Sequence, residues 1–317
     1  MFLCHSFGKR GGENLTDNHS PVLIDESSLR TLKLMTNNVV IQDSSQNAYS
    51  GSGNSNSPFR TRGLDFQEIR AYQPGDDIRQ IDWRTTAKYG KPFTKLYTDE
   101  KERPVYFICD MRSRMKFASH GDFKSVVAAR MTMFLAYLVE KKKDRIGSVI
   151  LMPDHLKSVD LRGNGGTEEM IADFVAAGGP VAEKVDTSTL EQALLLLARE
   201  AKNGAMIFIC SDFSDLTENA IRILNQLSLR RTIALMHVYD EMEREMPYGL
   251  WTMTDGQKTE TIDMTNKVNR EAFEKTFQER IVLIEETVKK YGWGYISVRT
   301  TDDYLSKLTD HMRKGQM

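Results

Sequence analysis

A chain of 317 residues, of which 40% are apolar, is long enough to bury at least one sizeable core. Its 43 basic and 44 acidic residues give a formal net charge of −1, so no overall field attracts nucleic acid or an anionic membrane. The three cysteines, Cys4, Cys109 and Cys210, are too few and too scattered for a disulfide framework or a structural zinc site, and we expect buried free thiols in a reducing compartment.

The start of the chain has no apolar segment of signal-peptide length, because the sequence turns polar at His5. The most apolar segment, residues 131–139, is much shorter than the roughly 20 residues that a membrane span requires. We therefore expect a cytoplasmic protein without a membrane span.

Residues 1–58 are predicted to be an N-terminal extension. Its apolar spacing predicts a short helix over residues 25–35, with Ser27 or Ser28 as the N-cap. Residues 44–58 are rich in Ser, Asn and Gly and cannot bury a core of their own. We interpret them as a linker or mobile loop.

Residues 59–103 are a dense mixture of charges, with ten Lys and Arg against eight Asp and Glu. This near balance, interleaved with isolated apolar side chains, predicts arginine–carboxylate pairing over a small apolar strip. We expect Ile78, Ile81 and Trp83 to pack and so to brace this segment against the main domain.

From residue 104 onward, apolar runs of strand length alternate with stretches of helical period. The expected strands are 104–110, 146–152, 156–161, 205–210, 232–238 and 294–298. The expected helices are 123–142, 167–177, 190–202, 217–227, 267–291 and 302–313, with a hairpin across 249–264. This order predicts one doubly wound α/β domain over 104–317, with a mainly parallel sheet and helices on both faces.

The strand ends of such a sheet are where chemistry is expected. Ligands of doubly wound sheets bind beyond the carboxyl ends of the strands, where the strand order reverses. Asp110 ends the first strand and Asp212 follows a later one, so the two carboxylates would emerge side by side if these strands are neighbours. Thr187 and Thr189, before the helix that leads to the later strand, could join them.

A more specific signal lies upstream of the sheet. Residues 62–84 read RGLDFQEIRAYQPGDDIRQIDWR. This string resembles the hallmark stretch of the von Willebrand factor A-like proteins of the domain-of-unknown-function 58 family, which are commonly paired with MoxR-type AAA+ ATPases. The resemblance runs from about Phe59 to the C-terminus. It implies a von Willebrand factor A-like fold and a non-enzymatic adaptor that works with such an ATPase on a client protein.

The candidate partner-binding residues follow from this resemblance and from the expected site around Asp110 and Asp212 at the strand ends, which we call the crevice. In the hallmark segment, Pro74 and Gly75 supply a turn, and charged residues on either side either pair internally or contact a partner. The full set of candidates is Arg70, Asp76, Asp77, Arg79, Asp110, Arg112 and Arg114.

The resemblance also implies a metal-ion-dependent adhesion site, in which Mg²⁺ is held by an Asp-x-Ser-x-Ser motif and by a Thr and an Asp from later loops. A hard cation of this kind prefers oxygen ligands in octahedral geometry. Asp110 matches the first position, Asp212 the later Asp, and Thr187 or Thr189 the threonine. Ser113 has the right chemistry at the wrong spacing.

The two serine positions of that motif hold Arg112 and Arg114, which cannot ligate a cation and would repel it. One alternative is that an arginine folds into the crevice and pairs with Asp110 and Asp212, so that it replaces the metal. The other is that both arginines point outward and a weak site for Mg²⁺ survives. We favour the metal-free alternative, because an ion pair is the commoner fate of facing Arg and Asp side chains.

Two rival functions remain at this stage. One is a Mg²⁺-dependent ligand-binding domain, and the other is a hydrolytic or phosphoryl-transfer enzyme built on the carboxylates Asp110, Asp212 and Asp215. No nucleophile motif supports the enzyme. Nucleic-acid binding through residues 60–103 is disfavoured by the balanced charge.

Overall fold

The computed structural model describes residues 19–37, 39, 66–73, 76, 78–97, 103–163, 165–179, 186–254 and 259–315. Within these ranges the chain divides into two compact units. The main unit includes residues 19–39 and 103–315, and the small unit includes residues 66–97. Cys4 and the expected linker at 44–58 lie outside the described residues.

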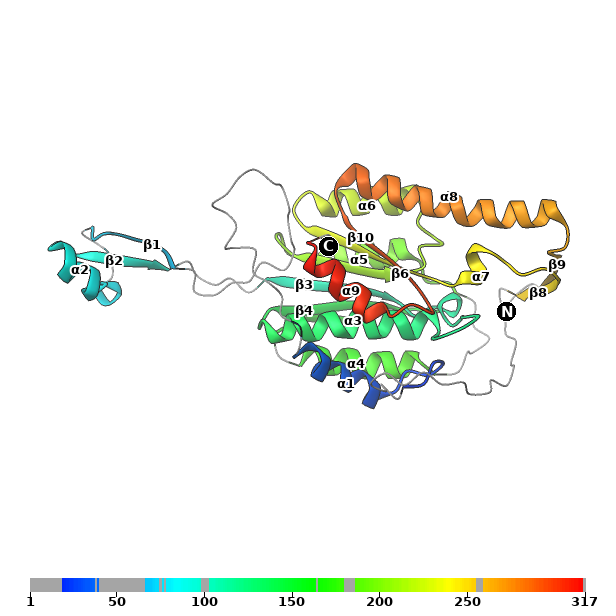
Figure 1. Cartoon of the computed structure of the whole chain (residues 1–317), viewed down its shortest axis with the longest axis horizontal. Coiled ribbons are helices and arrows are strands. Elements are labelled where there is room, and N and C mark those ends of the chain that lie inside the picture. The colour runs from blue at the N-terminus through cyan, green and yellow to red at the C-terminus, as the bar shows by residue number, and fades with distance from the viewer. Residues whose placement is uncertain are drawn as a thin grey trace. The chain divides into compact units, whose positions relative to one another are not determined.

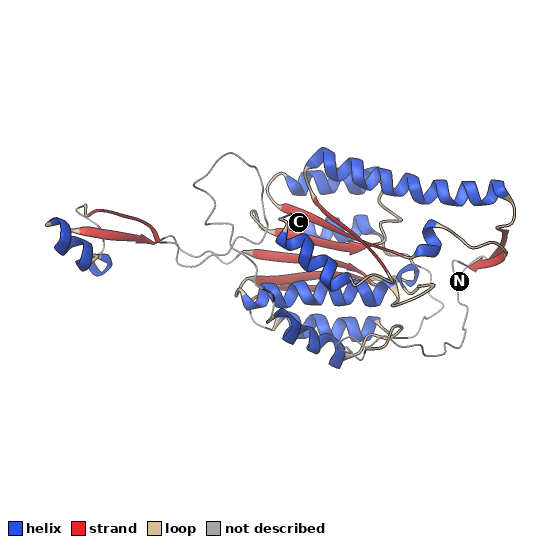
Figure 2. Cartoon of the chain, in the orientation of Figure 1, coloured by secondary structure: helices blue, strands red, loops and turns tan. Residues whose placement is uncertain are grey.

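In the described part of the main unit, six strands form one sheet in the order β10-β7-β6-β3-β4-β5. Figure 2 shows the strands in red between layers of helices. The strands are β3 (Pro104–Asp110), β4 (Arg145–Leu151), β5 (Leu156–Arg162), β6 (Met206–Ser211), β7 (Thr232–Tyr239) and β10 (Gly294–Arg299). All neighbours are parallel except the edge strand β5, which is antiparallel to β4. The predicted doubly wound, mainly parallel sheet is confirmed.

Helices cover both faces of this sheet (Figure 1). One face carries α3 (Lys124–Lys141), α4 (Gly166–Ala177) and α9 (Tyr304–Arg313), with α1 (Glu26–Thr36) packed on α3 and α4. The other face carries α5 (Leu190–Glu200), α6 (Glu218–Ser228) and α8 (Lys267–Tyr291). The short helix α7 (Glu241–Arg244) and the hairpin of β8 (Leu250–Thr254) and β9 (Thr259–Asp263) connect β7 to α8.

The core is divided by the sheet because successive side chains of a strand point to opposite faces. Tyr106 and Ile108 of β3 belong to the cluster under α5 and α6. Phe107 points to the other face, where its ring stacks on that of Phe208 with centroids 5.4 Å apart. Nearly every side chain of α3 is buried, because the sheet lies on one side of this helix, α4 and α9 flank it, and α1 packs on its outer side.

The N-terminal helix begins at a different cap from the one expected. Asp25, and not Ser27 or Ser28, is the N-cap of α1. Its carboxylate accepts the backbone N–H of Ser28 at 2.7 Å and the hydroxyl of Ser27 at 2.6 Å, because an aspartate at this position can reach the free N–H groups of the first turn. Leu29 and Leu32 are fully buried, as the apolar spacing predicted.

The small unit is held together by local pairing. Strands β1 (Phe66–Ala71) and β2 (Phe93–Tyr97) are antiparallel, and α2 (Trp83–Tyr89) lies between them in the chain. Asp82 caps α2 by accepting the backbone N–H groups of Arg84 and Thr85, and Gly90 ends the helix in the left-handed conformation.

The apolar residues of this unit are unevenly exposed. Ile81 is half-buried, whereas Ile78 and Trp83 are 64% and 68% exposed. The packing of residues 59–103 on the main domain, with these three residues as a brace, stays a prediction. None of the helices in the described ranges is long and apolar enough to cross a membrane.

Candidate functional site

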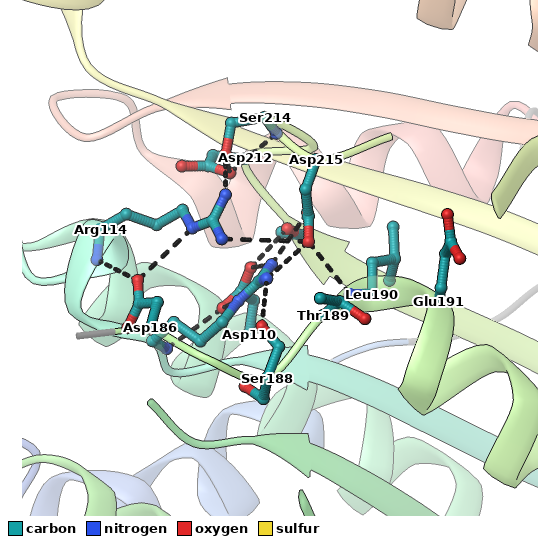
Figure 3. A network of polar contacts seen from close by, with 12 residues as sticks. Asp110, Arg114, Asp186, Ser188, Thr189, Leu190, Glu191, Asp212, Ser214 and Asp215 are labelled. Carbon is teal, nitrogen blue, oxygen red and sulfur yellow. Dashed lines mark hydrogen bonds and ion pairs between the residues drawn. The ribbon is translucent and has the colours of Figure 1, made fainter. Parts of the chain in front are cut away.

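The site lies where the strand order of the main sheet reverses. From β3 the chain first builds β4 and β5 on one side, and then β6, β7 and β10 on the other. Cys109 of β3 pairs with Cys210 of β6, so the residues that follow them leave the sheet at the same edge. Asp110 and Asp212 therefore emerge from neighbouring strands, as the sequence predicted (Figure 3).

Arg112 is turned into this crevice and is 0% exposed. Its Nε and Nη2 donate to the two oxygens of Asp110 at 2.8 and 2.5 Å. Its Nη1 and Nη2 donate to the two oxygens of Asp215 at 2.6 and 3.0 Å. One guanidinium therefore bridges two carboxylates in bidentate geometry. Arg112 therefore folds into the crevice and pairs with Asp110, as the first of the two alternatives expected. Its second partner is Asp215 and not Asp212.

The groups around this ion pair satisfy its remaining hydrogen-bonding capacity. Nη1 of Arg112 also donates to the backbone carbonyl of Ser188 at 3.1 Å, and the Ser211 hydroxyl donates to Asp110 at 2.7 Å. The first N–H of α5, on Leu190, donates to Asp215 at 3.0 Å. The positive end of the α5 dipole therefore supports the negative charge of Asp215.

The pKa values agree with a permanent ion pair. Burial alone would raise the pKa of Asp215, but Arg112 and the N–H of Leu190 lower it below its ordinary value. Burial alone would lower the pKa of Arg112, but Asp110 and Asp215 raise it further above its ordinary value. Asp215 and Arg112 are therefore charged at neutral pH, and the loss of Arg112 would leave buried carboxylate oxygens without their partner.

Lys124 forms a second group of enclosed ion pairs. It is the first residue of α3, and its side chain is 2% exposed. Its ammonium donates to Asp212 at 2.9 Å and to Glu243, which also accepts from Arg280 at 3.0 Å. Burial alone would raise the pKa of Asp212, but the charges of Lys124 and Arg114 lower it. Burial would lower the pKa of Lys124, but Asp212 and Glu243 raise it.

Arg114 is the cation at the mouth of the crevice, with 29% of its side chain exposed. Its Nη1 donates to the Ser214 hydroxyl at 2.5 Å, and its Nε lies 3.6 Å from a carboxylate oxygen of Asp186 (Figure 3). Asp186 also accepts the backbone N–H of Ser113 at 2.8 Å. The mouth is thus built by loops that follow β3 and β6 and precede α5.

The residues present do not fit the magnesium site that the resemblance implied. Both oxygens of Asp110 are engaged by Arg112, and Asp212 is engaged by a lysine ammonium. Thr187 is exposed, and its hydroxyl lies 3.5 Å from a backbone carbonyl. Ser113 lies in a 3-10 turn, with its N–H bonded to a carboxylate. Within the described ranges, no three His, Cys, Asp or Glu side chains are arranged to hold a metal ion.

The candidate partner-binding residues of the hallmark segment lie in the small unit. Arg70 donates to Asp76 at 2.7 Å, and Asp76 also accepts the N–H of Gln73 at 2.9 Å. Arg79 is exposed in the 3-10 turn η2 (Ile78–Gln80), and Asp77 lies outside the described residues. The expected arginine–carboxylate pairing is therefore present for Arg70 and Asp76, while their role in partner contact stays a prediction.

Several residues of the site were not predicted from the sequence, namely Lys124, Asp186, Ser188, Ser211 and Glu243. Most of them act through backbone groups or through partners far along the chain, which leave no local pattern. Lys124 is the exception. The residues three, four and seven positions after it are all apolar, so helical spacing places it on the buried face of α3.

Comparison with known proteins gives the family. A family model described as "Protein of unknown function DUF58" matches residues 68–282. The chain belongs to the DUF58 family. The matched range includes most of the small unit, the crevice and the larger part of α8.

Relatives of this DUF58 chain occur in mycobacteria. The uncharacterized proteins Mb1516 of Mycobacterium bovis and Rv1480 of Mycobacterium tuberculosis are each 24% identical to it over 243 residues, which is 76% of this chain and 76% of each relative.

Two solved structures are similar at 13% identity. An aerotolerance-related membrane protein from Bacteroides fragilis, with multiple mutations to serines, gives a TM-score of 0.41 and covers 67% of this chain and 99% of its own. An uncharacterized membrane spanning protein from Vibrio fischeri gives a TM-score of 0.25 and covers 68% and 98%.

Proposed function

We propose that this DUF58 protein is a cytoplasmic, non-enzymatic adaptor. It cooperates with a MoxR-type AAA+ ATPase in the assembly or maturation of client proteins. Its von Willebrand factor A-like crevice is a degenerate metal-ion-dependent adhesion site, in which the Arg112 side chain takes the place of the metal. The proposal rests on the resemblance of residues 62–84 to partners of such ATPases and on the chemistry of the crevice.

One observation carries the non-enzymatic part of the proposal. Asp110 and Arg112 are both 0% exposed, and each is fully engaged by the other and by neighbouring groups. A carboxylate that acts as a base or a metal ligand must reach a substrate. In the described part of the crevice, Asp110, Asp212 and Asp215 are instead neutralised by internal cations, which supports a structural role for these acids.

The cysteines support the reducing compartment that the proposal assumes. Cys109 and Cys210 are buried free thiols, as the sequence predicted. Burial raises the pKa of the Cys109 thiol to about 12 and that of Cys210 well above its ordinary value. Such thiols stay protonated and unreactive at neutral pH, so neither behaves as a catalytic nucleophile.

The adaptor proposal is tested by affinity capture from native lysate. The full-length tagged chain is incubated with ATP, with ADP or without nucleotide, and bound proteins are identified by mass spectrometry. We expect a AAA+ ATPase whose recovery depends on the nucleotide, since such ATPases change conformation with ATP. The tag alone is the control for adventitious binding.

Two results would contradict the proposal. One is that no AAA+ ATPase is recovered under any nucleotide condition. The other is that the purified chain hydrolyses a phosphomonoester or phosphodiester in the presence of Mg²⁺ or Mn²⁺, and that the conservative change Asp110→Asn abolishes the hydrolysis.

A further inference from the structure

The small unit presents a face that its own fold does not use. Trp83, Arg84, Ala87 and Lys88 of α2 are all exposed. Their spacing places them within one side of the helix, because positions i, i+1, i+4 and i+5 span less than half of its circumference. We call these four residues the α2 face. Its tryptophan is 68% exposed, which is unusual for the largest apolar side chain.

The exposed residues of this face do not hold the small unit together. No residue of α2 is buried. The helix is fixed instead by the Asp82 cap, by the left-handed Gly90 and by the hydrogen bond from the Asp82 N–H to Phe93 at 2.8 Å. Trp83 is therefore available for a contact outside this unit. Exposed aromatic residues beside arginine are the composition of binding hot spots.

The charge around the α2 face is positive, although the whole chain is nearly neutral. Residues 78–92 contain four basic residues and one acidic residue, Asp82. That carboxylate is engaged by the backbone at the start of α2, where it accepts from two N–H groups. The Lys88 ammonium lies 5.4 Å from the centre of the Tyr89 ring, so aromatic and cationic groups adjoin here.

We propose that the α2 face docks onto an acidic surface of a partner protein that also accepts the Trp83 indole. This inference rests on the proposed adaptor function and names the surface that makes the contact. Trp83 supplies apolar burial, and Arg84 and Lys88 pair with carboxylates around it, which is the arrangement of an aromatic anchor with a charged rim.

A protein surface suits this face better than the other anionic partners do. A helix of seven residues is about 10 Å long, which is short for an amphipathic helix that lies in a membrane interface. Four cations beside an aspartate are also few for the phosphate contacts that dominate nucleic-acid affinity.

Photo-crosslinking in native cells tests the proposal. Ala87, at the centre of the α2 face, is replaced by p-benzoylphenylalanine in the full-length chain, and the crosslinked peptide is sequenced by mass spectrometry. We expect a peptide of another protein with net negative charge. The crosslink yield should fall by roughly tenfold or more in the variants Trp83→Ala and Arg84→Glu with Lys88→Glu.

A matched control lies on the main unit, where Leu229 is 78% exposed next to the exposed Arg230. The double change Leu229→Ala with Arg230→Glu likewise removes an exposed apolar side chain and reverses an adjacent positive charge, and it should leave the yield unchanged. The crosslink from position 87 is first measured in a chain that keeps Trp83, Arg84 and Lys88, so this first result does not depend on how the Trp83, Arg84 or Lys88 variants fold.

The outcomes separate this inference from the proposed function. A crosslink to an acidic protein, together with affinity capture that recovers no AAA+ ATPase, supports the docking face and contradicts the adaptor function. Affinity capture of a AAA+ ATPase without a crosslink from position 87 supports the adaptor function and contradicts the docking face. The docking face is overturned if position 87 crosslinks to lipid, to nucleic acid, to its own chain, to a peptide without net negative charge, or to nothing.

Discussion

The charged side chains of the crevice are enclosed and paired, whereas those of the α2 face are exposed to solvent. In the crevice, Arg112 and Lys124 are almost completely enclosed and each neutralises two carboxylates. On the α2 face, Arg84 and Lys88 are exposed beside an exposed tryptophan. Charge that is enclosed contributes to the stability and shape of the loops, whereas exposed charge is available to a partner. Changes in the crevice should therefore alter stability, and changes on the α2 face should alter binding.

The largest effect is expected for Arg112→Ala. This change leaves Asp110 fully buried without its cation, so it should lower the free energy of unfolding by about 4–5 kcal/mol. Urea unfolding followed by circular dichroism measures the loss. Arg114→Ala is the control, because the Arg114 side chain is partly exposed and should cost no more than about 1 kcal/mol. Equal losses in the free energy of unfolding for the two variants would contradict the claim that enclosed charge contributes more to stability than exposed charge.

Lys124→Met should cost about 3 kcal/mol at neutral pH, and the cost should depend on pH. In the native chain the lowered pKa of Asp212 stabilises the fold above the unfolded value of about 3.9, and this contribution is lost as the pH falls below it. Without Lys124, burial favours protonated Asp212 and raises its pKa. The variant should therefore approach the native chain in stability as the pH falls from about 7 to about 4.

Urea unfolding of both chains across that pH range measures this difference. A deficit that stays constant with pH would show that the loss comes from packing of the lysine stem and not from its charge.

The smallest effect on stability is expected on the α2 face. Trp83→Ala should change the free energy of unfolding by no more than about 0.5 kcal/mol, because the side chain is 68% exposed and no residue of α2 is buried. Differential scanning calorimetry measures the change. A loss of several kcal/mol would place Trp83 in a packed contact and restore the bracing role that the sequence first suggested.

Much of the fold could be predicted because its signals are local. The helical period and the flanking Asn266 and Gly292 define α8 at the predicted residues 267–291. Residues 59–103 were set apart as a segment, but the strands inside it were missed, because β1 and β2 are short and mix charged with apolar residues, so neither period is visible. The helix α7 has four residues, which is too short for a periodic pattern.

The site was only half predictable for a physical reason. Parallel strands bring their ends together, so the proximity of Asp110 and Asp212 follows from strand order alone. The choice of partner for Arg112 does not follow from strand order. Lys124, which lies 88 residues before Asp212 in the chain, already neutralises that carboxylate, and Arg112 pairs with Asp215. Competition between two buried cations is decided by tertiary packing and leaves no trace in local sequence.

The central claim is that the Arg112 side chain takes the place of a metal ion beside Asp110. The direct measurement is isothermal titration of Mg²⁺ and Mn²⁺ into the purified full-length chain, together with the melting temperature in excess Mg²⁺ and in excess chelator. We expect no saturable binding and the same melting temperature under both conditions. Saturable binding of either ion that raises the melting temperature, and that Asp110→Asn abolishes, would show that a metal and not the arginine completes the site.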